Sequence, residues 1–217
     1  MTDFVAARKA MVDCQVRPSD VTSYPIIAAM LAVPREEFVP RAARETAYLG
    51  AHIPLAPGRV LLDARSFGKM LEALNIQPTE MVLDIGCGLG YSTALLARLA
   101  EFVVGVEADE AMAAEAEAIL AAQSADNAVV VAGELAAGAA AHAPYDVIVL
   151  QGAYETMPQA LVDQLKLGGR IAAIHAEGAY GTCRIGIKTS AGVSWRRAFD
   201  AAAPVLPGFA AAPAFVF

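Results

Sequence analysis

The clearest chemical signal in the sequence is a short glycine-rich segment. Residues 84–91 read DIGCGLGY, and they follow an apolar run and precede a helical pattern. Because glycine has no Cβ, such a loop lets the backbone pass close to a ligand. A dinucleotide-binding loop has the spacing G-x-G-x-x-G and receives a pyrophosphate, whereas this loop has the spacing G-x-G-x-G. Asp84 would repel a pyrophosphate and attract a cation, so the segment favours a sulfonium ligand with an amino-acid tail.

A second acidic residue is placed to bind the same ligand. Glu107 comes directly after the next apolar run, 102–106. In open parallel sheets, an acid at the end of the second strand accepts hydrogen bonds from ribose hydroxyls. Its two carboxylate oxygens match two hydroxyl donors, so Glu107 is the predicted ribose partner.

The loop resembles the first motif of class I S-adenosylmethionine-dependent methyltransferases. This resemblance implies that S-adenosyl-L-methionine is the cofactor. It also implies that Glu134, after the run 128–132, accepts from the adenine amino group. Gln151, after the run 146–150, would lie where the methyl group meets its acceptor. The cofactor-binding residues expected on this basis are Asp84, Gly86, Gly88, Gly90, Tyr91, Glu107, Glu134 and Gln151.

The pattern around these residues predicts the elements that position them. Five apolar runs rich in Val and Ile, which alternate with helical stretches, lie at 81–85, 102–106, 128–132, 146–150 and 170–174. Buried strands that alternate with helices predict an α/β fold with a doubly wound, mostly parallel, Rossmann-like sheet. We expect the helix that begins near Pro158 to end at the glycines 168–169, and an antiparallel hairpin to follow over 182–189 and 194–200.

The region before the sheet has a different texture. Residues 1–78 are rich in proline and predict short helices, one beginning near Ser23 and Pro25 and another over 66–74. We therefore expect an N-terminal helical cap with an acceptor-side segment over 1–78, and a cofactor-binding α/β domain over 79–217.

Several segments resemble the protein-L-isoaspartate (D-aspartate) O-methyltransferase family. They are VPREEFVP (33–40), AYLGAHIPLAPG (47–58), the glycine loop and YDVIVLQGAYETMPQALVDQLKLGGRI (145–171). The resemblance covers the chain from about Met11 to Ile174. It implies protein repair, in which carboxylates of isoaspartyl or D-aspartyl residues in a protein or peptide acceptor are methylated.

The acceptor side departs from the pattern of that family. Val60 and Leu62 stand where the family has two hydroxyl residues, and Asp63 adds a negative charge. We therefore expect isoaspartyl methylation to be weak or absent, and the change of Val60 to Thr with Leu62 to Ser to raise it. Arg59 and Arg65 could hold a different carboxylate. No residue stands out as catalytic, which leaves open a small-molecule or undamaged protein acceptor, or a cofactor-binding protein without this activity.

Composition excludes several other classes of protein. The chain has 217 residues, of which 57% are hydrophobic, and a formal net charge of −7. This is enough apolar material for a core, while the acidic balance argues against nucleic-acid and membrane-surface binding. The cysteines, Cys14, Cys87 and Cys183, form no ligand-spaced pair and no even set, so we expect no metal site, no disulfide framework and a cytoplasmic location. The oligomeric state stays open.

The longest stretch without a charged residue does not predict a membrane span. It covers 201–217 and contains Pro204, Pro207 and Pro213. A spanning helix needs about 20 apolar residues, and prolines interrupt helices. We expect no transmembrane helix.

Overall fold

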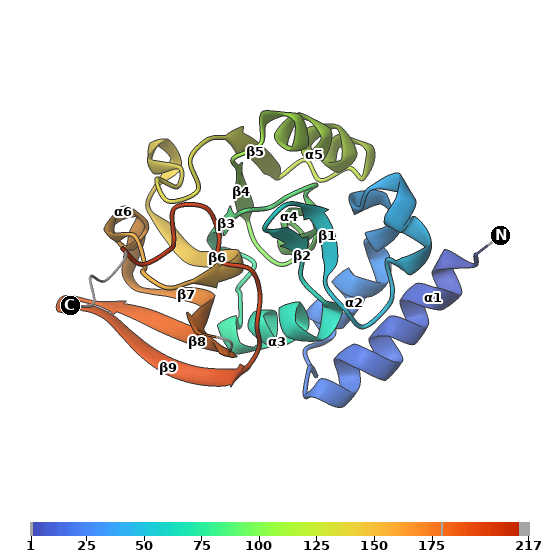
Figure 1. Ribbon diagram of the computed structural model, residues 1–217, viewed down its shortest axis with the longest axis horizontal. Coiled ribbons are helices and arrows are strands. Elements are labelled where there is room, and N and C mark those ends of the chain that lie inside the picture. The colour runs from blue at the N-terminus through green and yellow to red at the C-terminus, as the bar shows by residue number, and fades with distance from the viewer. Residues whose placement is uncertain (1, 179, 213–217) are drawn as a thin grey trace.

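A mostly parallel sheet forms the centre of the molecule (Figure 1). The structure is a computed structural model that describes residues 2–178 and 180–212. Across these residues, seven strands form one sheet in the order β5-β4-β3-β6-β7-β8-β9. Five strands run parallel, namely β3 (Met81–Ile85), β4 (Phe102–Glu107), β5 (Ala128–Ala132), β6 (Tyr145–Tyr154) and β7 (Leu165–Glu177).

The sheet confirms the predicted strands and adds their order. Each predicted apolar run lies within one of the five parallel strands. The predicted hairpin is present as β8 (Tyr180–Thr189) and β9 (Gly192–Asp200), both antiparallel to their neighbours. The strand order reverses direction at β3, because β4 and β6 lie on its two sides. Ligands of open α/β sheets bind at the carboxyl ends of strands beside such a reversal.

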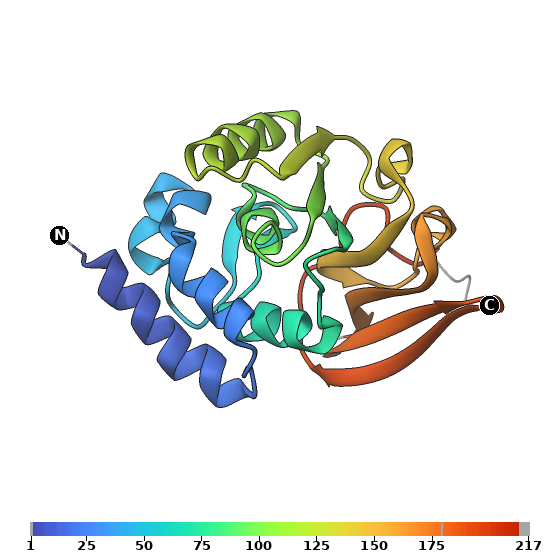
Figure 2. The ribbon, with the colours of Figure 1, turned by 180° about the vertical axis from the view of Figure 1, so that it is seen from behind.

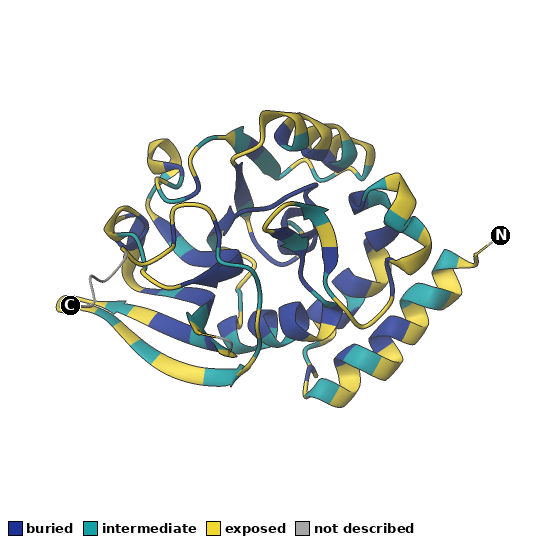
Figure 3. Ribbon diagram, in the orientation of Figure 1, coloured by how far each residue is buried: buried dark blue, intermediate teal, exposed yellow. Residues whose placement is uncertain are grey.

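The two faces of the sheet are covered differently. Alternate strand residues such as Val82 and Val103 join a core with the helices of one face, and Leu83 and Val104 join a second core. The first core includes residues from α1 (Phe4–Met11), α2 (Tyr24–Ala32), α3 (Ala64–Leu74), α4 (Tyr91–Leu96) and α5 (Glu110–Ala122). The second includes residues from α6 (Gln159–Asp163) and the C-terminal segment. Figure 2 shows the first group of helices from behind, and the exposed sides of α5 and β9 are visible in Figure 3.

Local signals set the ends of the helices. Pro25 lies in the first turn of α2, and Ser23 precedes that helix, as predicted. Asp63 caps α3, where its carboxylate accepts a hydrogen bond from the Ser66 N–H at 2.8 Å. Asn75 ends α3 in the left-handed conformation, with φ of 49°. The described N-terminal region and the sheet share one core on this face, and the boundary at 78 stays a prediction.

Two local features differ from the sequence-based expectation. The helix near Pro158 ends at Asp163, and residues 167–169 belong to β7 instead of ending a helix. The reason is that Leu165 pairs with Tyr145 of β6, so β7 begins at Leu165, before the glycines at 168 and 169. The N-terminal region also contains a two-stranded hairpin, β1 (Ile53–Ala56) and β2 (Arg59–Leu61), besides its helices.

Short helical turns complete the described elements. They are η1 (Val12–Val16), η2 (Arg17–Ser19), η3 (Arg35–Phe38), η4 (Arg41–Thr46) and η5 (Ala140–His142). No helix found in 2–178 or 180–212 has the length and apolar character needed to cross a membrane. Of the uncharged stretch 201–217, the part that includes Pro213 lies outside the described residues.

Candidate functional site

The glycine loop connects β3 to α4 at the carboxyl end of β3. Gly86, Gly88 and Gly90 have φ values of +78°, +59° and +91°. Residues with a Cβ rarely adopt this left-handed conformation, so the spacing of the glycines is a requirement of the turn. The loop is held to the neighbouring strand, because the N–H groups of Gly86 and Cys87 donate to the carbonyl of Val106 at 2.8 and 3.2 Å.

Asp84 anchors the loop from below. Its carboxylate is fully buried. One oxygen accepts from Gln151 Nε2 at 2.7 Å, and the other accepts from the hydroxyls of Ser92 and Thr93 at 2.6 and 2.8 Å. Asp84 therefore joins the ends of β3 and β6 to the first turn of α4. The side chains of Asp84 and Gln151 are therefore hydrogen-bonded within the protein, and this buried network supports the glycine loop.

Burial controls the ionisation of Asp84. Loss of hydration raises the pKa of Asp84 to about 6, and the hydrogen bonds from Ser92, Thr93 and Gln151 only partly offset this rise. The carboxyl group therefore takes up a proton more readily in the folded chain than in the unfolded chain.

This shift predicts a pH-dependent difference between the protein and an Asp84→Asn variant. Between the ordinary pKa of 3.8 and the folded value of about 6, the folded state binds the proton and the unfolded state does not. Asp84 therefore favours folding most at pH values below its ordinary pKa of 3.8. This contribution is lost as the pH rises through the folded-state pKa of about 6. Relative to the variant, the wild-type free energy of unfolding should fall by roughly 3 kcal/mol over this range. Urea unfolding of both proteins at several pH values measures it, and parallel curves would contradict the shift.

Glu107 lies at the carboxyl end of β4, beside the loop. Its side chain is fully buried. One oxygen, Oε2, accepts from the N–H of Gly88 at 2.8 Å. The other, Oε1, accepts from the N–H groups of Ala108 and Asp109 at 2.8 and 3.1 Å. These contacts fix the carboxylate at the place that the sequence predicts for a ribose partner.

A side chain that the sequence did not connect with Glu107 also binds it. Arg59, from β2, donates from Nη1 to Oε1 and from Nη2 to Oε2, both at 2.7 Å. The side chains of Arg59 and Glu107 are only 6% and 0% exposed. Although burial alone would raise the pKa of Glu107, the hydrogen bonds and charge of Arg59 hold this pKa below its usual range.

Two apolar side chains cover the loop from the same side as Arg59. A Cβ added to Gly88 would lie 2.5 Å from a methyl carbon of Leu55, on β1. A Cβ added to Gly86 or Gly152 would meet methyl carbons of Leu206 at 3.4 and 2.6 Å. The space in front of the glycine loop is therefore filled by the chain itself.

The C-terminal segment 201–209 is held in place by backbone pairing. The N–H of Ala153 donates to the carbonyl of Pro204 at 2.8 Å, and the N–H of Leu206 donates to the carbonyl of Ala153 at 2.9 Å. His52, just before β1, contacts the carbonyl of Ala202 through Nε2 at 2.7 Å. The hairpin, through Leu55 and Arg59, and this segment, through Leu206, thus cover the glycine loop together. Figure 1 shows the segment passing β6.

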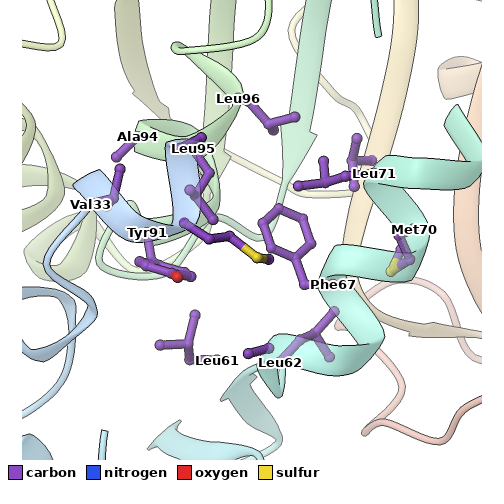
Figure 4. Packing of buried hydrophobic residues seen from close by; sticks show 14 of the residues in the cluster. Val33, Leu61, Leu62, Phe67, Met70, Leu71, Tyr91, Ala94, Leu95 and Leu96 are labelled. Carbon is purple, nitrogen blue, oxygen red and sulfur yellow. The ribbon is translucent and has the colours of Figure 1, made fainter. Parts of the chain in front are cut away.

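Other candidate residues lie apart from this cluster. Glu134 and Arg65 are exposed, and neither side chain has a hydrogen-bond or ion-pair partner within the described part of the chain. Tyr91 is buried, with its ring 5.8 Å from Phe38 and 4.8 Å from the Arg35 guanidinium. The ring of Tyr91 therefore packs in the core between α4 and the N-terminal region (Figure 4).

The acceptor-side residues lie against the core and beside α3. Leu62 is 1% exposed and packs in the same core as Phe67 (Figure 4). Val60 is half-buried against that core. In this conformation the side chain of Leu62 completes the apolar core under α3, and an acceptor role for position 62 stays a prediction. Asp63 caps α3 and lies 3.3 Å from His52 Nδ1, so its charge has local partners.

The contacts that the sequence analysis missed fall into two kinds. Ser92 and Thr93 lie directly after the glycine loop, so their position in the first turn of α4 was a usable signal. Arg59 and Leu206 are far from Glu107 and Gly152 in the sequence, and no local pattern marks them. The three cysteines are free, and the described residues contain no His, Cys, Asp and Glu cluster that could hold a metal ion.

Comparisons of sequence identify relatives of the chain. The family model described as "Protein-L-isoaspartate(D-aspartate) O-methyltransferase (PCMT)" matches residues 6–179. A protein-L-isoaspartate O-methyltransferase 1 of Rhodopseudomonas palustris is 38% identical over 170 residues, which are 78% of this chain and 69% of that protein. A protein-L-isoaspartate O-methyltransferase of Roseiflexus castenholzii is 36% identical over 169 residues, which are 78% and 77% of the two chains.

Solved structures share the fold. A protein-L-isoaspartate O-methyltransferase superposes with a TM-score of 0.80 and 21% identity over 93% of this chain and 66% of that chain, just under two thirds of its length. A Plasmodium falciparum protein described as a protein-L-isoaspartate O-methyltransferase in complex with S-adenosyl-L-homocysteine superposes with a TM-score of 0.77 and 16% identity. It matches over 95% of this chain and 99% of that one. At these identities the likeness establishes the architecture only.

Proposed function

We propose that this chain, which belongs to the protein-L-isoaspartate(D-aspartate) O-methyltransferase family, transfers a methyl group from S-adenosylmethionine to a carboxylate of a protein or peptide. The observation that carries this proposal is the joint placement of the glycine loop and Glu107. Both lie at the strand reversal beside β3, where open α/β sheets bind their ligands.

The donors and acceptors present fit this cofactor. The left-handed glycines bring the loop backbone to the front of the sheet. Glu107 has two carboxylate oxygens, as a ribose diol requires, and both accept from Arg59 in this structure. Asp84 and Gln151 fix the glycine loop through their mutual hydrogen bond. Only the glycine loop and the acids around it fit the cofactor in this conformation, because Arg59, Leu55 and Leu206 fill the space next to the loop. When bound, S-adenosylmethionine supplies a methyl group on a sulfonium centre.

The acceptor chemistry places few demands on the protein. A side-chain carboxyl of the aspartate type has a pKa near 4 and is ionised at pH 7, so it attacks a methyl group without a general base. What the chain must provide is alignment of the two reactants and exclusion of water. This fits a site in which the buried acids, Asp84 and Glu107, hold structure and bind instead of moving protons.

Within this proposal, the isoaspartyl side chain of a damaged protein is the first acceptor to test. A different carboxylate acceptor is the second candidate, and a specific observation favours it. The family's hydroxyl positions carry Val60 and Leu62, and Leu62 is part of the core. The described segment therefore offers no hydroxyl at these two positions for a substrate amide or carboxylate.

Methyl transfer from labelled S-adenosylmethionine tests the proposal. The purified protein should transfer label to an isoaspartyl peptide in a base-labile form, and not to the matched peptide with ordinary aspartate. Because both hydroxyl residues are absent, turnover should lie roughly two to four orders of magnitude below that of a typical enzyme. Turnover near the enzyme median of about 10 s⁻¹ would show that the missing hydroxyls are unimportant.

Binding measurements separate the remaining outcomes. Calorimetric titration should show binding of S-adenosylhomocysteine and none of NAD. Binding without transfer to the isoaspartyl peptide, but with transfer to a component of a cell extract, would favour the second acceptor class. Binding of NAD and not of S-adenosylhomocysteine would contradict the proposed cofactor.

A further inference from the structure

We propose that the β1–β2 hairpin, residues 53–61, is an autoinhibitory plug, in which Arg59 takes the place of the cofactor's ribose on Glu107. The inference rests on the proposed function, since it concerns the same site. It adds that cofactor binding and the Arg59–Glu107 ion pair exclude one another. The cofactor therefore binds only after the hairpin has withdrawn.

The Glu107 carboxylate has no free acceptor position in this structure. A carboxylate offers about four lone-pair sites. Oε1 already accepts from Arg59, Ala108 and Asp109, and Oε2 accepts from Arg59 and Gly88. The backbone donors belong to the loop and to the strand end, so they stay when a ligand binds. Ribose hydroxyls can reach Glu107 only by replacing the guanidinium.

The hairpin also fills the space next to the glycine loop. Leu55, on the other strand of the hairpin, lies against Gly88, and the Arg59 Nη2 atom would lie 3.1 Å from a Cβ at Gly86. Arg59 as a residue is 5% exposed. A ligand that approaches the loop backbone therefore meets the hairpin at more than one point, and a rotation of Arg59 alone leaves Leu55 in the way.

In the part of the chain that the structure describes, the hairpin has no backbone pairing with the large sheet, and Ile53 and Leu61 anchor it to the core through their side chains. Within the described residues β1 and β2 pair only with each other, apart from the seven-stranded sheet. An isolated two-stranded hairpin is marginally stable, so its position depends on the Arg59–Glu107 pair and on side-chain packing. His52 connects the start of the hairpin to the C-terminal segment through Ala202. Loss of the ion pair would therefore leave side-chain packing and the His52 contact to hold the hairpin.

The plug predicts an unusual gain of binding on mutation. We expect Arg59→Ala to bind S-adenosylhomocysteine at least about tenfold more tightly than the wild type, because apparent affinity rises with the fraction of open protein. Arg170→Ala is the matched control. It removes a similar two-bond pair with Glu80, at 2.9 and 2.7 Å, at the opposite end of β3. Its affinity should equal that of the wild type in the same titration, and circular dichroism confirms that each variant is folded.

Hydrogen exchange on the unmodified protein gives a second readout. Saturating S-adenosylhomocysteine should increase amide exchange across 53–61 while it slows exchange in the glycine loop, 86–90. Reduced exchange in both segments would overturn the plug, since the hairpin would then close over the cofactor. If Arg59→Ala fails to fold, Arg59→Gln, which keeps an amide donor, takes its place and should still bind more tightly than the wild type.

The outcomes separate this inference from the proposed function. Equal or weaker binding by the folded Arg59 variant, beside a wild type that binds, overturns the plug and leaves the proposed function standing. Binding by the Arg59 variant alone supports both. Absence of binding in the wild type and in the folded Arg59 variant overturns the proposed function together with the plug.

Discussion

Replacement of Glu107 with alanine should lower the free energy of unfolding by about 3–5 kcal/mol, because it leaves a buried charge without its partner. Arg59 is almost fully buried and spends two of its N–H donors on Glu107. The same change removes the acceptor for the ribose hydroxyls. In a protein that already lacks Arg59, loss of Glu107 should therefore weaken S-adenosylhomocysteine binding by about 10- to 150-fold. Urea unfolding of Glu107→Ala measures the first effect, and calorimetric titration of Arg59→Ala with and without Glu107→Ala measures the second.

The double variant Arg59→Ala with Glu107→Ala is the control for that stability loss. Removal of both partners leaves no isolated charge, so the double variant should be more stable than Glu107→Ala alone. If Glu107→Ala is as stable as the wild type, water solvates Arg59 in the variant and the guanidinium is not left as an isolated buried charge. If the double variant is no better than the single one, the loss comes from the vacated space and not from the charge.

Introduction of the two missing hydroxyls should lower stability strongly at position 62 and change it little at position 60. Leu62→Ser should cost about 2–5 kcal/mol, since truncation of a core leucine leaves a cavity and the new hydroxyl lies in an apolar core. Val60→Thr, at a half-buried position, should change stability by less than about 1 kcal/mol. Denaturant unfolding of the single variants measures both, and Val60→Thr serves as the control for Leu62→Ser.

The isoaspartyl turnover of the same variants would test the sequence-based expectation that the two hydroxyls together raise isoaspartyl methylation. Since Leu62 packs with Phe67 in the core, its replacement is expected to damage the fold under α3 without a gain in activity. A folded Leu62→Ser protein with increased isoaspartyl turnover would mean that position 62 reaches the acceptor in another conformation. Any gain from Val60→Thr alone would place only position 60 at the acceptor.

The sequence by itself determined the sheet and the loop. Runs such as 102–106 and 128–132 are apolar on both faces and alternate with helical stretches, which is typical of buried parallel strands. The glycines at 86, 88 and 90 occupy left-handed positions that other residues rarely tolerate, so their spacing specifies the turn locally. Because the carboxyl ends of parallel strands meet at one edge, the approach of Glu107 to this loop also followed from the pattern.

The tertiary structure alone decided what lies in front of the loop. Arg59 reaches Glu107, and Leu206 reaches Gly152, across long stretches of chain. Neither contact has a local periodicity or spacing, because an ion pair or an apolar contact between distant segments depends on where the whole chain places them. The same holds for Leu62 and Tyr91, whose residue types suited a ligand site or a core equally well. Packing against α3 and the N-terminal region assigned Leu62 and Tyr91 to the core, and the path of the chain placed Arg59 on the carboxylate of Glu107.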